Sequence, residues 1–176
     1  SEWLYVEGYK FDNPNSTAAL FAGVEYAKKH NTKIALTFSD IFIIELFKEN
    51  LEKAVRASDL IFCNENEAKR YTEKDNFEDA FAELCKQCPN VVVTRGGEGS
   101  SILWEGTRYE IPSYPATPVD TTGAGDMFAG TFLYGIINHG DANKAGHLAS
   151  LTAAKIVSQI GARMKSDINL LKDQIK

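Results

Sequence analysis

Short apolar runs alternate along this chain with longer segments in which apolar residues recur every three or four positions. The short runs predict β-strands and the longer segments predict α-helices. The run DLIFC is apolar over nearly its whole length, which is typical of a parallel strand buried on both faces. The strands expected in the first half of the chain are Trp3–Glu7, Lys33–Phe38, Asp59–Cys63 and Asn90–Thr94.

Helices are expected between and after these strands. Thr17–His30 follows Asn13 and Pro14, which offer the cap and first-turn chemistry of a helix start. The other expected helices are Ile41–Val55, Glu65–Thr72, Phe77–Lys86, Ala124–Asn138 and Asp141–Ile160, with a short amphipathic tail after them.

Two more strands, Ser101–Trp104 and Arg108–Ile111, are separated by a turn at Glu105-Gly106 and predict an antiparallel hairpin. The alternation predicts an α/β fold, a doubly wound and mostly parallel sheet with helices on both faces and this hairpin at the edge. Ligands of such sheets bind beyond the carboxyl ends of the strands. We therefore expect the site at these strand ends and in the loop before Gly123.

Charge and composition exclude several classes of protein. The net charge is −5 and the Lys and Arg residues are scattered, which argues against a nucleic-acid partner. No apolar run approaches the ~20 residues that span a bilayer, and no signal peptide opens the chain. We expect a globular cytoplasmic protein with no membrane partner. The chain starts at Ser1 directly before a strand, so we also expect a processed or truncated polypeptide.

The cysteines and histidines give little sign of chemistry. Cys85 and Cys88 form a single C-x-x-C pair at the end of a predicted helix. A redox-active pair usually lies at the start of a helix, and a zinc site would need further Cys or His ligands. We expect reduced thiols. His30, His139 and His147 have no mutual spacing that suggests a metal site, so we expect structural roles for them.

The stretch from Val119 to Gly130 is the one that points to chemistry, because a turn of small residues leads directly into an apolar helix. Gly123 and Gly125 allow close approach to the backbone. Their N–H groups, with those of Ala124 and Asp126, would leave the helix N-terminus and form an anion cradle.

Taken alone, this pattern also has a purely structural explanation, in which Asp126 stabilises the helix start and the glycines allow close packing. Two common phosphate motifs are not met, since Phe128 replaces the third glycine of G-x-G-x-x-G and Thr131 replaces the lysine of a phosphate-binding loop. A carboxylate beside an anion cradle would repel bound phosphate. It suits a base that takes a proton from an attacking hydroxyl while the cradle holds the phosphoryl group in transfer.

The run Asp120–Gly130 resembles the second signature of the PfkB family of carbohydrate kinases, the ribokinase and adenosine kinase group. The segment NENE from Asn64 to Glu67 resembles the N-x-x-E motif of that family. Thr94–Gly99 resembles its T-x-G-x-x-G nucleotide loop, and Ala149–Val157 resembles its closing helix. The order and spacing of these motifs agree with the family over nearly the whole chain, which implies a ribokinase-like fold.

The resemblance implies transfer of the γ-phosphoryl group of ATP to a hydroxymethyl group of a small sugar or nucleoside acceptor. It makes Asp126 the general base and gives the anion hole to the backbone amides of Gly123, Ala124, Gly125 and Asp126. The nucleotide-binding residues that it implies are Asn64, Thr94, Gly96, Gly97, Gly99 and Ser150. It also implies Mg²⁺ near Asn64 and Glu67, held through water. Further, it suggests a monovalent cation such as K⁺ near Asp120 and Thr122.

Each of the other motifs has a simpler explanation as well. Asn64 and Glu67 have the spacing of a helix capping box, which is compatible with a metal role. Thr94–Gly99 could be only a turn between strands, and Ala149–Val157 could be only a helix packed on the sheet.

The family comparison also reveals a difference in length. Family members carry a first signature, a small β lid and most acceptor-binding residues in their amino-terminal half, and none of these is visible here. Residues 1–176 are therefore expected to be the carboxyl-terminal nucleotide-binding and catalytic portion of such a domain, with strands left unpaired. The sequence leaves open whether the chain is active alone, and whether it forms a homodimer.

The acceptor is only weakly indicated. Leu36–Glu49 resembles the corresponding region of adenosine kinases more than that of ribokinases, which favours an adenosine- or ribose-type acceptor. Core packing by Phe42 and Phe47 is the simpler explanation of its aromatic residues. A non-catalytic nucleotide-binding or interaction module that keeps the kinase fold remains the alternative.

Overall fold

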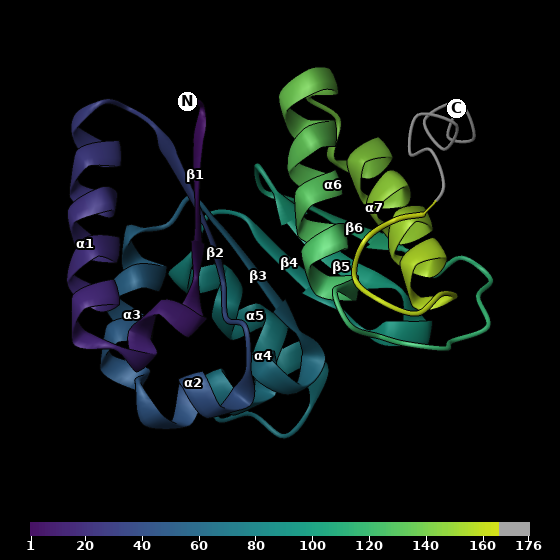
Figure 1. Cartoon of the computed structure of the whole chain (residues 1–176), viewed down its shortest axis with the longest axis horizontal. Coiled ribbons are helices and arrows are strands. Elements are labelled where there is room, and N and C mark those ends of the chain that lie inside the picture. The colour runs from purple at the N-terminus through teal and green to yellow at the C-terminus, as the bar shows by residue number, and fades with distance from the viewer. Residues whose placement is uncertain (166–176) are drawn as a thin grey trace. The chain divides into compact units, whose positions relative to one another are not determined.

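The computed structural model describes residues 1–165 (Figure 1). Its six-stranded sheet has the order β1-β2-β3-β4-β5-β6, and the first three strands are parallel neighbours. The expected α/β architecture, a mostly parallel sheet with helices, is therefore confirmed. The chain divides into two compact units, one made of residues 1–93 with 103–106 and one made of residues 94–102 and 107 onward.

The first unit contains the parallel strands and five α-helices. The strands are β1 (Trp3–Glu7), β2 (Lys33–Thr37), β3 (Leu60–Asn64) and β4 (Val91–Thr94). A 3₁₀ turn, η1 (Gly8–Asp12), follows β1. The helices are α1 (Pro14–Lys29), α2 (Ile41–Leu46), α3 (Lys48–Ala57), α4 (Glu65–Thr72) and α5 (Phe77–Gln87).

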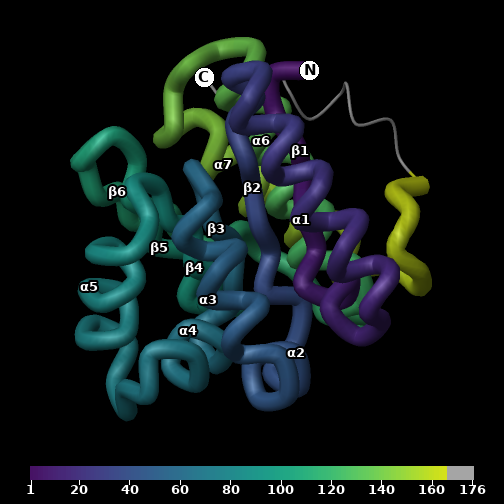
Figure 2. Tube along the Cα trace, turned by 90° about the vertical axis from the view of Figure 1, so that its left-hand side faces the viewer, coloured from purple at the N-terminus to yellow at the C-terminus, as the bar shows by residue number. Residues whose placement is uncertain are grey.

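The core of this unit lies under one face of the strands. Leu36, Ile61 and Val93 belong to this core cluster, and Ala35, Leu60 and Val92 on the other face of the strands are fully buried as well. Leu51 of α3 and Leu84 of α5 are buried in the same cluster. Helix α1 runs beside β1 and β2 (Figure 2).

Local signals fix most helix starts. The Asn13 side chain accepts hydrogen bonds from the backbone N–H groups of Asn15 and Ser16, and Pro14 occupies the first helical position. The expected single helix Ile41–Val55 is wrong, because Phe47 interrupts it with φ −127° and ψ 29° and separates α2 from α3. The interruption allows each short helix to bury its own apolar face.

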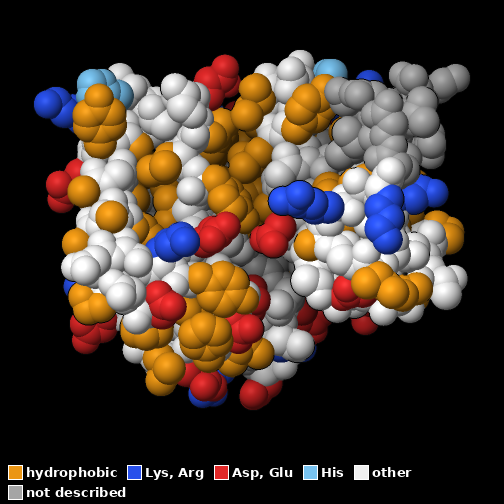
Figure 3. All heavy atoms as spheres, viewed as in Figure 1, with side chains coloured by type: hydrophobic (Ala, Val, Ile, Leu, Met, Phe, Trp, Pro, Cys, Tyr) orange, Lys and Arg blue, Asp and Glu red, His pale blue; other side chains and the backbone are white. Residues whose placement is uncertain are grey.

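The aromatic residues of this region are arranged differently from expectation. Phe47 packs against the core, but Phe42 is 41% exposed and lies against Tyr9, with ring centroids 6.0 Å apart. Hydrophobic side chains gather on the surface over α2 in Figure 3, where Tyr9, Ile41, Phe42 and Leu46 are exposed. Core packing therefore explains Phe47 and does not explain Phe42.

The second unit is built from the hairpin and two long helices. Its elements are η2 (Gly96–Glu98), β5 (Ser100–Trp104, whose last two residues fall in the first unit), β6 (Thr107–Ile111), α6 (Ala124–His139) and α7 (Ala142–Val157). The expected hairpin is confirmed. Its turn residues, Glu105 and Gly106, both have positive φ, as a two-residue hairpin turn requires.

Helices α6 and α7 pack closely in this unit. A Cβ atom on Gly135 would come within 2.6 Å of the Ala145 Cβ, so the glycine allows the two helices to touch. Phe132 and Ile156 are fully buried. Helix α7 starts at Ala142, with Asp141 as its cap, and ends at Val157, three residues earlier than expected.

Two further expectations concern the ends and edges of the fold. Strand β1 lies at the edge of the sheet and has one neighbour, β2, among residues 1–165. The amphipathic tail expected after Ile160 lies mostly outside the described residues. Within 1–165, no helix combines the length and the apolar character needed to cross a membrane.

Candidate active site

Helix α6 begins at a turn that only glycine can form. Gly123 has a φ of 79°, and a Cβ atom on it would lie 2.7 Å from the Ala162 Cβ. Having no side chain, Gly123 also offers no cap to the helix. The N-terminus of α6 is therefore left without side-chain partners for its amides.

The first-turn amides are not all available to a ligand. The N–H group of Ala124 donates to the Thr121 carbonyl at 3.1 Å. Among the described residues, the N–H groups of Gly125 and Asp126 have no hydrogen-bond partner. The cradle expected over Gly123 to Asp126 thus loses the Ala124 amide in this structure, because that amide closes the turn.

The carboxylate of Asp126 faces open space. The side chain is exposed, and within residues 1–165 it has no hydrogen bond and no ion pair. It lies at the wall of a hollow of about 390 Å³. This hollow is lined by Gly123, Asp126, Met127, Gly130, Thr131, Tyr134, Leu148 and Ala162. Nothing described here holds the carboxylate away from a ligand.

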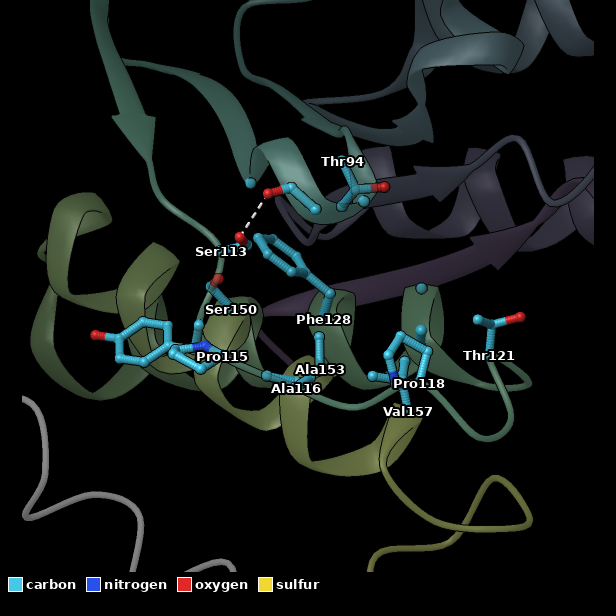
Figure 4. Close-up of a pocket in the computed structure, with 17 residues that line it drawn as sticks. Thr94, Ser113, Pro115, Ala116, Pro118, Thr121, Phe128, Ser150, Ala153 and Val157 are labelled. Atoms are coloured by element: carbon cyan, nitrogen blue, oxygen red, sulfur yellow. Dashed lines mark hydrogen bonds between the residues drawn. The ribbon is translucent and has the colours of Figure 1, made fainter.

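A larger cavity of about 530 Å³ is lined by other residues of the same helix turn (Figure 4). Four segments form its walls: the loop after β4, the extended loop after β6, the start of α6, and the end of α7. The lining residues are Thr94, Gly96, Gly97, Gly99, Ser113, Tyr114, Pro115, Ala116, Pro118, Thr121, Ala124, Gly125, Phe128, Ser150, Ala153, Ala154 and Val157. The size is within the usual range for small-molecule sites.

This cavity brings together most of the predicted nucleotide-binding residues. Thr94, the three glycines of its loop and Ser150 all line it, together with two residues of the α6 turn. In Figure 4, Thr121 and Pro115 lie at opposite sides of the cavity, and Thr94 lies above Phe128. The Ser150 hydroxyl donates to the Pro112 carbonyl at 2.8 Å, so it links α7 to the loop after β6.

The glycines of the site divide into two groups. A Cβ atom on Gly99 would lie 2.0 Å from the Ile111 carbonyl oxygen, so the fold requires this glycine as it requires Gly123. At Gly97 and Gly125 the φ angles are ordinary, and an added Cβ would meet nothing within 4 Å. The fold does not need glycine at these two positions. Their lack of a side chain keeps volume free where the cavity is open.

The Asp120 carboxylate forms hydrogen bonds both with the turn before α6 and with the segment after α7. One carboxylate oxygen accepts from the Thr122 N–H at 2.9 Å and the other from the Gly161 N–H at 3.0 Å. Hydrogen bonds from Thr122 and then Gly161 lower the pKa of Asp120 to about 2. The group therefore stays ionised, and both of its oxygens already have a backbone partner.

Asn64 and Glu67 lie in the first unit and form the capping box. The Asn64 side chain accepts from the Glu67 N–H, and the Glu67 carboxylate accepts from the Asn64 N–H, each at 2.9 Å. Glu67 is only 6% exposed. Burial raises the pKa of Glu67 to about 7, the Asn64 N–H opposes that rise, and the charge of Asp40 adds to it. Among residues 1–165, no three His, Cys, Asp or Glu side chains are grouped to hold a metal.

The thiols and imidazoles have structural surroundings. Cys88 is buried, its Sγ atom lies 3.5 Å from the Ser58 carbonyl oxygen, and burial raises its pKa to about 11. That pKa leaves almost no thiolate at neutral pH. His147 contacts Tyr114, and the rings of His30 and His139 each lie against a tyrosine ring.

Several lining residues were not predicted from the sequence. Gly130 and Tyr134 follow Asp126 at intervals of four along α6, and this helical spacing could have identified one wall of the smaller hollow. Tyr114, Pro115 and the rest of the loop after β6 carry no periodic signal, because an extended loop has none.

Known proteins are similar to this chain in sequence and in fold. The model of the pfkB family of carbohydrate kinases matches residues 1–169. A 5-dehydro-2-deoxygluconokinase of Clostridium tetani is 30% identical over 166 residues, which cover 88% of this chain and 49% of that protein. An adenosine kinase of Saccharomyces cerevisiae is 28% identical, over 81% of this chain and 46% of that protein.

A solved structure agrees closely with the model. The adenosine kinase of Sinorhizobium meliloti superposes with a TM-score of 0.93 at 29% identity, over 99% of this chain and 54% of that one. The chain thus spans about half the length of the relatives it matches.

Proposed function

Because the chain belongs to the pfkB family of carbohydrate kinases, we propose that it is the nucleotide-binding and catalytic portion of an ATP-dependent kinase. The enzyme would transfer the γ-phosphoryl group to a hydroxymethyl group of a small sugar or nucleoside. One observation carries this proposal: the first turn of α6 separates two cavities, with free amides in the turn and a free carboxylate facing the smaller cavity.

The larger cavity is proposed to hold ATP. Its apolar walls suit a base and ribose, and the open positions at Gly97 and Gly125 leave room for phosphates near the helix N-terminus. The amides of Gly125 and Asp126 would donate to the oxygens of the transferred group. Loss of one such donor typically costs ~10²–10³ in rate.

Asp126 is proposed as the general base on the acceptor side. Its carboxylate would take the proton of the hydroxymethyl group as that oxygen bonds to the γ-phosphorus. The bond between that phosphorus and the oxygen bridging to the β-phosphate breaks at the same time, and ADP leaves. A well-placed base is typically worth ~10²–10⁴ in rate.

Two cations are proposed to assist. Mg²⁺ would be held through water near Asn64 and Glu67, and its binding would favour loss of the proton from the Glu67 carboxyl, whose pKa burial raises to about 7. Bound Mg²⁺ supplies positive charge against the phosphates. A monovalent cation such as K⁺ would lie near Asp120 and Thr122, where Asp120 retains its negative charge.

An adenosine- or ribose-type acceptor is proposed from two observations. The relatives include adenosine kinases as well as a 5-dehydro-2-deoxygluconokinase. Tyr9 and Phe42 form an exposed aromatic pair beside the carboxyl ends of β1 and β2, and such pairs can stack on a nucleobase.

The alternative is a nucleotide-binding module without catalysis. The chain spans about half the length of its relatives, and this favours the alternative for the chain alone. Calorimetric titration with Mg-ATP, followed by phosphoryl transfer assays with adenosine, ribose and fructose, separates the two. Binding with transfer to one acceptor is expected. Binding without any transfer would support the module, and no binding would contradict both.

A further inference from the structure

The larger cavity has an unusual set of side chains for a site that would recognise one base. Within the described residues, none of its lining side chains is a carboxylate, an amide, an ammonium or a guanidinium group. Those are the groups that usually tell adenine from guanine, since Asn and Gln pair with adenine edges and charged groups with guanine edges. Five lining residues have polar side chains, and each of these side chains carries a hydroxyl group: Thr94, Ser113, Tyr114, Thr121 and Ser150.

Three of these hydroxyls are already used by the wall itself. The Ser113 hydroxyl donates to the Gly97 carbonyl at 2.6 Å, a bond drawn in Figure 4, and the Ser150 hydroxyl donates to the Pro112 carbonyl at 2.8 Å. The Tyr114 hydroxyl lies 3.2 Å from Nδ1 of His147. The two remaining hydroxyls are those of Thr94 and Thr121, which lie apart from each other and from Pro115 in Figure 4.

Some backbone groups in and beside the wall are occupied as well. The Gly97 and Pro112 carbonyls accept the two serine hydroxyls, and the Val157 carbonyl accepts the Val119 N–H at 2.7 Å. Pro115 and Pro118 have no N–H to donate. The side chains of Pro115, Ala116 and Ala153 add apolar surface to the lining.

From this arrangement we infer that the cavity binds purine nucleoside triphosphates by shape and apolar contact and does not discriminate adenine from guanine. The inference rests on the proposed function, because it concerns the phosphoryl donor of that reaction. Apolar pockets discriminate between similar ligands by factors of only ~10–200. Sites that hydrogen-bond a distinguishing group discriminate by factors of ~10⁴–10⁵. Phosphate affinity, supplied by the α6 amides, is common to all such donors.

Calorimetric titrations of the chain with Mg-ATP, Mg-GTP and Mg-tripolyphosphate test the inference directly. We expect the dissociation constants for ATP and GTP to agree within ~10-fold, and tripolyphosphate to bind at least ~10-fold more weakly. GTP binding more than ~100-fold weaker than ATP would overturn the inference and leave the proposed function standing. Tripolyphosphate binding as tightly as ATP would show that the base does not use this cavity. If none of the three binds, the proposed function fails, and the inference with it.

Two matched variants refine the test. Ser150→Ala and Ser113→Ala each remove one wall hydroxyl, and both are expected to leave the ratio of ATP to GTP affinity unchanged within ~threefold, because neither hydroxyl is free to read a base. The ratio is informative even if a variant weakens all nucleotides. A ratio that changes tenfold or more in Ser150→Ala alone would overturn the inference by showing that this hydroxyl contacts the base.

Discussion

Asp126 and Gly125 are consecutive residues in the first turn of α6, yet they line different cavities: Gly125 the larger one and Asp126 the smaller. Successive residues of a helix point about 100° apart, so a single turn can present backbone amides to one ligand and a carboxylate to another. This division is what a direct transfer between two bound molecules needs. It places the proposed base one residue away from the proposed phosphate contact.

Gly125→Ala should separate stability from binding. An added Cβ meets nothing in the protein, and alanine is favoured over glycine in helices by up to ~1 kcal/mol, so the variant should melt about 2–4 °C higher. The same methyl group would occupy the space beside the α6 amides. We expect Mg-ATP affinity, measured by calorimetry, to fall at least ~10-fold, the scale of one lost charge-assisted hydrogen bond.

Gly23→Ala is the matched control for this experiment. Gly23 lies within α1, and its added Cβ would make only an ordinary contact with Leu4 at 3.8 Å. A comparable rise in melting temperature with unchanged Mg-ATP affinity is expected. Equal affinities for wild type and Gly125→Ala would show that Gly125 does not keep space for a ligand.

The glycine loop after β4 should respond unequally to substitution. Gly99→Ala forces a Cβ against the Ile111 carbonyl oxygen at a φ of 90°, and should destabilise the fold by roughly 2 kcal/mol or more. Gly97→Ala meets no atom within 4 Å and should leave the midpoint of urea unfolding almost unchanged. Similar midpoints for the two variants would contradict the division of these glycines into structural and ligand-related groups.

Glu67 should make folding stability depend on pH. Its pKa is about 7 in the folded chain, against 4.5 for an ordinary carboxyl, so the unfolded chain loses its proton first as pH rises. The stabilising effect of the protonated carboxyl is complete below pH 4.5 and is lost as pH rises through about 7. At 1.4 kcal/mol per pKa unit, the loss amounts to about 3.5 kcal/mol at most.

Urea unfolding of wild type and Glu67→Gln at several pH values measures this contribution. The variant should gain stability relative to wild type between pH 4.5 and 8, with Glu49→Gln as a control for removal of an exposed acidic side chain. A difference between wild type and Glu67→Gln that stays constant with pH would contradict a protonated, buried Glu67.

Most of the fold could be predicted because its signals are local. Asn13, Asn64 and Asn76 each cap the helix that follows, and the apolar runs match the strands within one or two residues. The interruption at Phe47 could not be predicted, because it depends on which side of each helix meets the core. A periodic pattern alone does not show where a helix changes direction.

The site was predictable in its motifs and less so in its geometry. The residues of the α6 turn and the loop after β4 do line one cavity, as their resemblance to a family implied. Two hydrogen bonds depend on how the loops close in three dimensions. One runs from the Ala124 N–H to the Thr121 carbonyl, and the other from the Ser150 hydroxyl to the Pro112 carbonyl. The hydrogen bond from the Gly161 N–H to the Asp120 carboxylate joins residues 41 positions apart, so no local sequence pattern predicts it.

The decisive measurement compares Asp126→Asn with wild type for Mg-ATP affinity and for phosphoryl transfer to the best acceptor. Asparagine keeps the shape of the side chain and removes its capacity to take a proton. The account predicts Mg-ATP affinity within ~threefold of wild type and a rate of transfer that falls ~10²–10⁴-fold. Transfer at the wild-type rate by a folded Asp126→Asn protein would contradict it.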